Sequence, residues 1–93
     1  MAHALVTKVN LEGRSPEEAT KLLNEQVIPM AKGLDGFQRG VWVRSADGST
    51  GMGIVAFDSE ESAKAAQEGL AANRPSDAPP ITSSEIWDVV GLA

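Results

Sequence analysis

Four side chains of this sequence could together bind an aromatic molecule. Gln38, Trp42 and Arg44 recur at even spacing in a stretch that alternates like a strand, and Phe57 belongs to the same face of the next strand. Aromatic rings hold a flat ligand, while a guanidinium or amide stabilises the oxyanion of a phenolate or carboxylate. Structural roles are also open, because Trp42 can fill the space over neighbouring glycines and Arg44 can be solvated near a turn.

Other residues capable of chemistry fit structural roles better. His3 is the single histidine, and with no obvious carboxylate to orient it, it is a poor general base. Asp58 and Glu61 fit a helix cap better than an acid/base pair. Gly51 and Gly53 precede a strand rather than a helix, so they do not form a phosphate loop. The sequence predicts no metal site and no other bound cofactor.

Composition limits both the partners and the size of the core. A length of 93 residues predicts a single domain, 1–93, with a thin core. The absence of cysteine favours a cytoplasmic protein without disulfides. A net charge of −5 and scattered lysines and arginines argue against nucleic acid and membrane surfaces as partners. No apolar run approaches the ~20 residues of a membrane span. Oligomerisation is the remaining means of enlarging the core.

Three segments are predicted before the central hairpin. Residues 2–10 predict a strand, after which Ser15 and Pro16 form a helix start with a capping box. Pro29 should kink the last turn of that helix, and Gly33 should end it as a left-handed cap. The helix carries one apolar stripe, formed by Ala19, Leu23, Val27, Met30 and Leu34.

A hairpin is the clearest local signal. Strands at 37–44 and 51–57 flank Asp47 and Gly48, and if these two are the central turn residues, Trp42 lies opposite Gly53. One face then should pack under the helices, and the face of Trp42 and Phe57 should be left uncovered. The predicted helix-packing face consists of Val41, Val43, Met52, Ile54 and Ala56.

The remaining segments complete a βαββαβ order. Asp58 or Ser59 should cap a second helix whose buried stripe is Ala63, Ala66 and Leu70. A surface loop at 74–80 and a last strand at 81–90 follow. This order predicts an α+β, ferredoxin-like antiparallel sheet with two helices on one face. Because the other face would expose an apolar patch, we expect a face-to-face homodimer, with Trp87 at an interface or in the core.

The residues at 34–37 (LDGF), the strand with Trp42, and the run FDSEESA at 57–63 resemble the antibiotic biosynthesis monooxygenase-like domains of the dimeric α/β-barrel superfamily. The resemblance covers nearly the whole chain, although its motifs are mostly fold signals that functionally unrelated members share. It implies a homodimeric α/β barrel with a hydrophobic pocket in each subunit. Activities among such proteins range from cofactor-independent oxygenation of polycyclic phenols to haem degradation.

Transferred residue by residue, the resemblance argues against haem degradation. Haem-degrading members use an asparagine on the first strand, a tryptophan and a histidine, but here Phe57 stands at the tryptophan position. Val6 or Thr7 lies near the asparagine position, and no histidine follows His3. Quinone-forming members use an indole with amide or guanidinium groups, as Trp42, Gln38 and Arg44 could supply. They also tend to use a tyrosine, which this chain lacks.

Two functions from different classes stay open. One is a cofactor-independent monooxygenase for aromatic or polyketide-like substrates, with Gln38, Trp42, Arg44 and Phe57 as the substrate-binding residues. The other is a non-catalytic dimeric module that binds a small aromatic or apolar ligand or serves as an accessory subunit. An amino-acid-sensing domain also remains open, although Gly13-Arg14-Ser15-Pro16 replaces its usual helix start.

Overall fold

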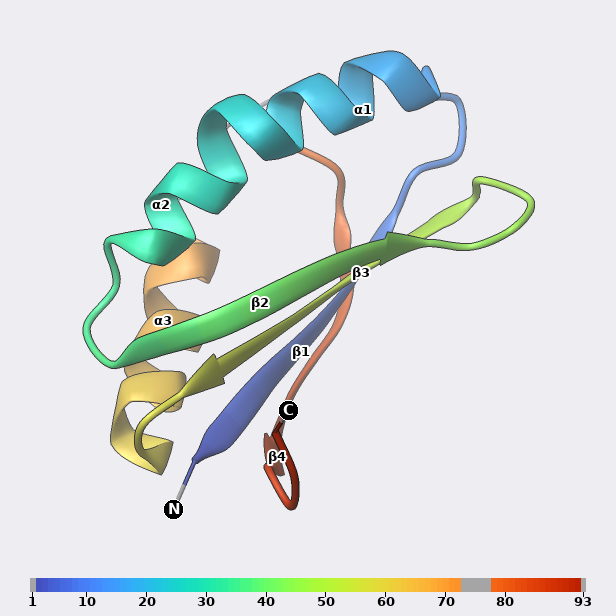
Figure 1. Cartoon of the computed structure of the whole chain (residues 1–93). Coiled ribbons are helices and arrows are strands. Elements are labelled where there is room, and N and C mark those ends of the chain that lie inside the picture. The colour runs from blue at the N-terminus through green and yellow to red at the C-terminus, as the bar shows by residue number, and fades with distance from the viewer. Residues whose placement is uncertain (1, 73–77, 93) are drawn as a thin grey trace.

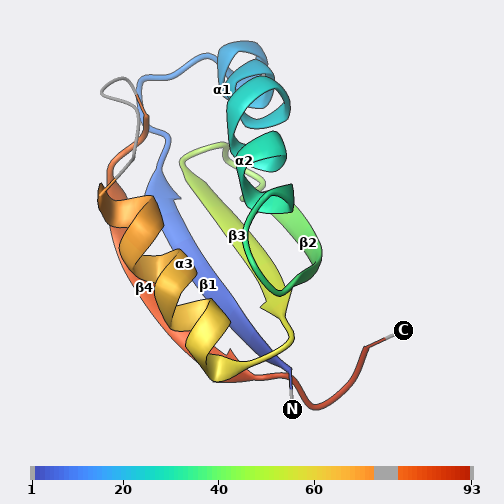
Figure 2. The same ribbon diagram turned by 90° about the vertical axis from the view of Figure 1, so that its left-hand side faces the viewer.

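A four-stranded antiparallel sheet carries all helices on one side (Figures 1 and 2). The computed structural model describes residues 2–72 and 78–92. The elements are β1 (His3–Asn10), α1 (Pro16–Leu22), η1 (Leu23–Val27), α2 (Ile28–Lys32), β2 (Phe37–Arg44), β3 (Thr50–Phe57), α3 (Glu60–Ala72) and β4 (Ile81–Asp88). The strand order is β2-β3-β1-β4, as the α+β ferredoxin-like prediction requires. Among the described residues, no helix is long and apolar enough to cross a membrane.

The first helical region is one arm, 16–32, in which α1, η1 and α2 are continuous; we call it the helical arm. The predicted cap is present, since Ser15 Oγ accepts a hydrogen bond from the Glu18 N–H at 3.4 Å. The disruption predicted around Pro29 takes the form of a π turn just before it. Proline has no N–H to donate to the carbonyl four residues earlier. The Ile28 N–H instead donates to the Leu23 carbonyl, which widens the helix by one residue.

The arm ends differently from the prediction. Gly33 has φ −84°, so the predicted left-handed cap is wrong. The N–H groups of Gly33 and Leu34 donate to the carbonyls of Met30 and Ala31, which tightens the last turn and makes a left-handed residue unnecessary. The positive φ occurs instead at Gly36, at +79°.

The closely packed part of the core lies between α3 and the sheet. Ser59 caps α3, because its Oγ accepts a hydrogen bond from the Ser62 N–H at 3.1 Å. Ala63 and Ala66 are buried on the sheet side of this helix, and their small side chains allow it to approach closely. Phe57 and Leu5 are the largest fully buried side chains among the described residues, and they belong to the same cluster. The predicted loop at 74–80 lies mostly outside the described residues.

The hairpin has the predicted register, with Trp42 opposite Gly53 and Val41 opposite Ile54. Asp47 stabilises the turn, since its Oδ1 accepts hydrogen bonds from Ser45 Oγ at 2.7 Å, Ser49 Oγ at 2.8 Å and the Ser49 N–H at 3.0 Å. The Ser49 backbone N–H and the two hydroxyls favour the charged form of this carboxylate and lower the pKa of Asp47 to about 2.

The predicted assignment of the two sheet faces is wrong. Val41 and Val43 are 50% and 44% exposed, whereas Val55 and Phe57 are buried below the helices. Trp42 and Arg44 line the space between the sheet and the helical arm. Two glycines explain which face lies below the helices. Gly40 and Gly53 leave room for the Trp42 indole beneath the arm. Because side chains alternate along a strand, Val41 and Val43 then point away from the arm. The face turned away from the helices carries Ala4, Val6, Val41, Val43, Met52, Ile54, Ala56 and Trp87; we call it the open face.

Candidate functional site

A cavity of about 400 Å³ separates the helical arm from the sheet. Whereas α3 packs onto β1, β3 and β4, the arm stands away from the strands (Figure 1). The volume falls within the range of small-molecule sites, which is roughly 300 to 1,000 Å³. The roof includes Ala19, Thr20, Leu22, Leu23, Val27, Met30 and Ala31, and the floor includes Leu5, Thr7, Val9, Trp42, Gly51, Gly53 and Val55.

Trp42 forms part of the floor because two glycines admit it. A Cβ on Gly40 would lie 2.7 Å from the six-membered ring of the indole, and one on Gly53 would lie 2.8 Å from Nε1. The ring therefore spans both glycines. This position agrees with the space-filling role expected for Trp42, and it also makes the indole part of the cavity wall.

Arg44 connects the hairpin to the start of the arm. Its guanidinium donates hydrogen bonds of 3.3 Å each to the Pro16 carbonyl and to Thr20 Oγ1. The residue is exposed, and among the described residues that line the cavity it is the single charged one. The β2–β3 hairpin end of the cavity is therefore positive, whereas the rest of the lining is mostly apolar.

The structure brings together two of the four predicted site residues. Trp42 and Arg44 line the cavity, but Phe57 is buried in the core beneath α3 and does not. Gln38 is exposed at an irregularity of the β2–β3 pairing between Phe37 and Arg39, which interrupts the alternation that the prediction assumed. Neither Gln38 nor Phe57 is among the cavity-lining residues.

Several lining residues escaped the sequence reasoning. Thr7 contributes a hydroxyl from β1, and Thr20 contributes another from α1. The alternation of Leu5, Thr7 and Val9 on one parity was visible in the sequence, but nothing in β1 itself indicated which parity would face the arm. A second hollow adjoins the cavity near β4, where Gln67 and Ser84 are hydrogen-bonded.

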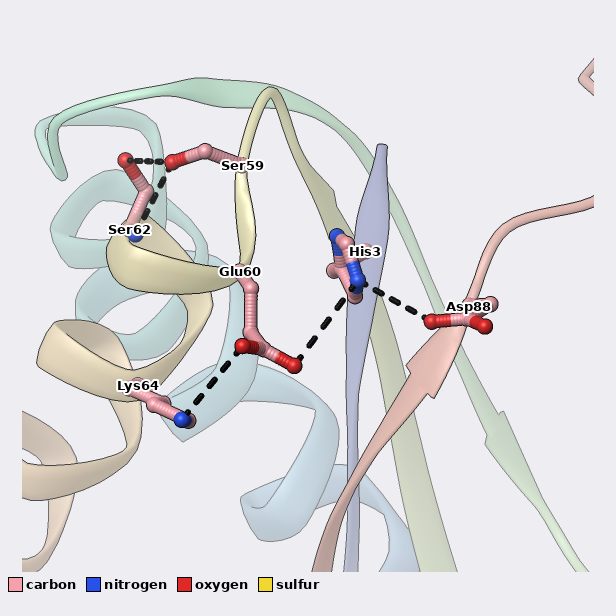
Figure 3. A network of polar contacts seen from close by, with 6 residues as sticks. All are labelled: His3, Ser59, Glu60, Ser62, Lys64 and Asp88. Carbon is pink, nitrogen blue, oxygen red and sulfur yellow. Dashed lines mark hydrogen bonds and ion pairs between the residues drawn. The ribbon is translucent and has the colours of Figure 1, made fainter. Parts of the chain in front are cut away.

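His3 has the carboxylate neighbours that the sequence reasoning did not find. Its Nε2 lies 3.0 Å from Asp88 Oδ1 and 3.9 Å from Glu60 Oε2, and Lys64 Nζ lies 3.4 Å from Glu60 Oε1 (Figure 3). This cluster connects β1, β4 and the first turn of α3. His3 does not line the cavity, so its geometry favours a structural role over that of a general base there.

No family model matches the sequence, and no curated protein matches it either. Solved structures do match. SnoaB, a cofactor-independent oxygenase from Streptomyces nogalater, is 14% identical, with a TM-score of 0.73 over 98% of this chain and 95% of that one. The monooxygenase ActVA-Orf6 of Streptomyces coelicolor, solved with nanaomycin D, is 15% identical, with a TM-score of 0.63 over 99% of this chain and 90% of that one.

A third similar structure is a putative antibiotic biosynthesis monooxygenase from Chloroflexus aurantiacus J-10-fl. It is 19% identical, with a TM-score of 0.67 over 100% of this chain and 98% of that one. At such identities the likeness concerns the backbone arrangement rather than the site. The chain therefore has the fold of an antibiotic biosynthesis monooxygenase-like domain, as the sequence resemblance predicted.

Proposed function

We propose that the protein is a cofactor-independent monooxygenase that oxidises an aromatic, polyketide-like phenol or anthrone. The observation that carries this proposal is an apolar cavity of about 400 Å³ with a single cationic end at Arg44. The fold shared with a cofactor-independent oxygenase and with a monooxygenase that was solved with nanaomycin D supports the same chemistry.

In this proposal the substrate supplies the electrons for oxygen. A ring CH₂ group of an anthrone becomes C=O by losing four electrons; dioxygen accepts them, and one oxygen atom enters the ring while the other leaves as water. Among the described residues that line the cavity there is no histidine, aspartate or glutamate. The substrate should therefore bind already ionised, as an enolate or phenolate.

Arg44 and Trp42 have distinct parts in this reaction. The guanidinium of Arg44 stabilises the substrate oxyanion, because a charge-assisted hydrogen bond is stronger than a neutral one. On binding, the oxyanion would replace the Pro16 carbonyl and Thr20 hydroxyl, which Arg44 contacts at 3.3 Å. Trp42 presents ring surface to the substrate from the floor.

Oxygen consumption tests the proposal. Protein freed of metal with EDTA and containing no flavin is mixed with 1,8-dihydroxyanthrone, and oxygen uptake and anthraquinone absorbance are followed together. We expect one oxygen consumed per quinone formed, at a rate at least tenfold above the protein-free solution at the same pH. A rate equal to that background, in the presence of measurable binding, would reject the oxygenase.

A non-catalytic ligand-binding module is the second candidate. The lack of a histidine, aspartate or glutamate that could act as a general base among the described lining residues favours it. If the protein is such a module, aromatic acids or phenols should raise its melting temperature without being converted. Thermal unfolding monitored alongside oxygen uptake therefore distinguishes the two functions.

We also infer that two copies associate through their open faces into a dimeric barrel. Val41 and Val43 are 50% and 44% exposed, and Trp87 on β4 is 56% exposed. Together with Val6, Met52 and Ile54 they form an apolar surface across the sheet, which a second identical sheet would cover. The helical arm and its cavity lie on the opposite side, so each subunit keeps its own site.

A further inference from the structure

A second hollow adjoins the cavity on the side of β4. The two hollows share Leu5, Thr7, Leu70 and Ile81 as lining residues, so they are neighbours along the same sheet surface. The second hollow adds Gln67 and Ala71 from α3 and Ser84 from β4. The apolar space beneath the arm therefore borders a hollow whose lining combines apolar residues with three neutral polar side chains, those of Thr7, Gln67 and Ser84.

The polar side chains of this hollow are neutral, and two of them are already hydrogen-bonded to each other. Gln67 Nε2 donates to the Ser84 carbonyl at 3.2 Å and to Ser84 Oγ at 3.0 Å. No other described residue contacts Gln67 Oε1 or the Thr7 hydroxyl by a hydrogen bond, so both can still accept one. Hydroxyl and carbonyl substituents match such groups, whereas an anion would find no positive charge in this lining.

The strand register shows how far this region lies from Arg44. Trp42, Gly53, Thr7 and Ser84 stand opposite one another in a single row across the four strands. Arg44 is two residues beyond Trp42 and therefore belongs to the next row on the same face, on β2 at the far edge of the sheet. Three strand spacings of about 4.8 Å separate the two edges by roughly 14 Å. A ligand with polar groups at opposite ends of a fused ring system fits this spacing.

We propose that Thr7, Gln67 and Ser84 form a neutral subsite that binds a hydroxyl or carbonyl at one end of an elongated aromatic acid or phenolate, whose anionic end lies at Arg44. The proposal deepens the proposed function, because it assumes that the cavity takes an aromatic anion. It does not require that the anion be oxidised.

Equilibrium binding measured by calorimetry tests the subsite. The probes are 2-naphthoic acid, 6-hydroxy-2-naphthoic acid, and 3-hydroxy-2-naphthoic acid, in which the hydroxyl adjoins the carboxylate. We expect the wild type to bind the 6-hydroxy acid about fivefold more tightly than 2-naphthoic acid. The 3-hydroxy isomer should gain nothing from its hydroxyl, because that group cannot reach the subsite.

Two variants and one control identify the residues responsible. Gln67→Leu and Thr7→Val should each reduce the preference for the 6-hydroxy acid. Gln67 does not line the first cavity, so Gln67→Leu should also leave the affinity for 2-naphthoic acid within twofold of wild type. Gln26→Leu, an exposed position on the arm that does not line either hollow, should keep the full preference.

Every outcome bears on the proposal. Equal weakening of both acids by Gln67→Leu would show that the residue only supports the cavity shape, and equal binding of both acids by the wild type would overturn the subsite. Binding with the expected preference but no oxygen uptake would reject the oxygenase and leave the subsite intact. Failure of the wild type to bind any of the acids would reject the subsite, whereas the proposed function would still be decided by oxygen uptake with 1,8-dihydroxyanthrone.

Discussion

The indole of Trp42 rests on Gly53, the residue directly opposite it on β3. A single Cβ at position 53 would lie 2.8 Å from Nε1, closer than side-chain contacts allow. This contact places the indole beneath the arm, and it explains why the mixed face of the hairpin, rather than its β-branched face, is the one that lines the cavity.

Gly53→Ala should displace the indole and destabilise the protein. We expect a loss of about 1 to 3 kcal/mol in the free energy of unfolding, because the ring has to move out of its place on the floor. Urea denaturation followed by circular dichroism measures it. Gly69→Ala in α3 is the matched control, since nothing lies within 4 Å of its added Cβ; it should stabilise the protein by about 0.5 to 1 kcal/mol. If Gly53→Ala were as stable as the wild type, the close contact between Trp42 and Gly53 would be contradicted.

Arg44→Met should weaken the binding of aromatic anions while leaving the fold intact. Removing a charge-assisted hydrogen bond to a carboxylate should reduce affinity about ten- to a hundredfold. Calorimetry with 2-naphthoic acid measures this change. Arg39→Met removes the same charge from β2 outside the cavity lining and should bind as the wild type does. Equal losses in the two variants would indicate a general effect of net charge instead of a contact at Arg44.

The Asp47 turn should make stability depend on pH at the acidic end. Because the pKa of Asp47 is lowered to about 2 by its hydrogen bonds, its contribution is full above about pH 4 and is lost as the pH falls through 2. The stability difference between the wild type and Asp47→Ala should therefore be largest near neutral pH and shrink towards pH 2. Urea midpoints at pH 7, 4 and 2.5 measure it. A difference that stays constant over this range would show that the charge of Asp47 plays no part.

Val41→Glu should separate the proposed dimer. A carboxylate at Val41, on the open face, would be buried without a partner in a face-to-face pair, which is strongly unfavourable. Sedimentation analysis should show a dimer for the wild type and a monomer for the variant. Ala65→Glu, at an exposed position of α3, adds the same charge on the helical side and should remain dimeric. A monomeric wild type at micromolar concentration would reject the pairing.

Local signals in the sequence predicted the fold well, but the choice of face depended on distant contacts. Asp47 and Gly48 specified the hairpin register because turn geometry and pairing are local. Both faces of that hairpin carry apolar residues, so alternation alone could not say which one the helices cover. Pro29 indicated a break in the helix, but the π turn depends on how the backbone before it redistributes its hydrogen bonds.

The candidate site was predicted only where it lies on a single strand. Trp42 and Arg44 share a face because they are two residues apart, but Gln38 lost that relation at the irregularity beside Phe37. Thr7, Gln67 and Ser84 lie on three elements far apart in the chain and form no motif. Their proximity follows from the strand order and from the placement of α3, neither of which a residue pattern specifies.

The contrast between α3 and the helical arm has a consequence for the evolution of this chain. Ala63 and Ala66 hold α3 to the sheet, so most changes there would damage folding. The arm is not constrained in this way, because its inner side chains border the cavity rather than a packed layer. Substitutions at Leu22, Leu23, Val27 and Met30 can therefore reshape the space available to a ligand at little cost in stability. Natural variation in ligand preference should accumulate in the arm while α3 remains nearly unchanged.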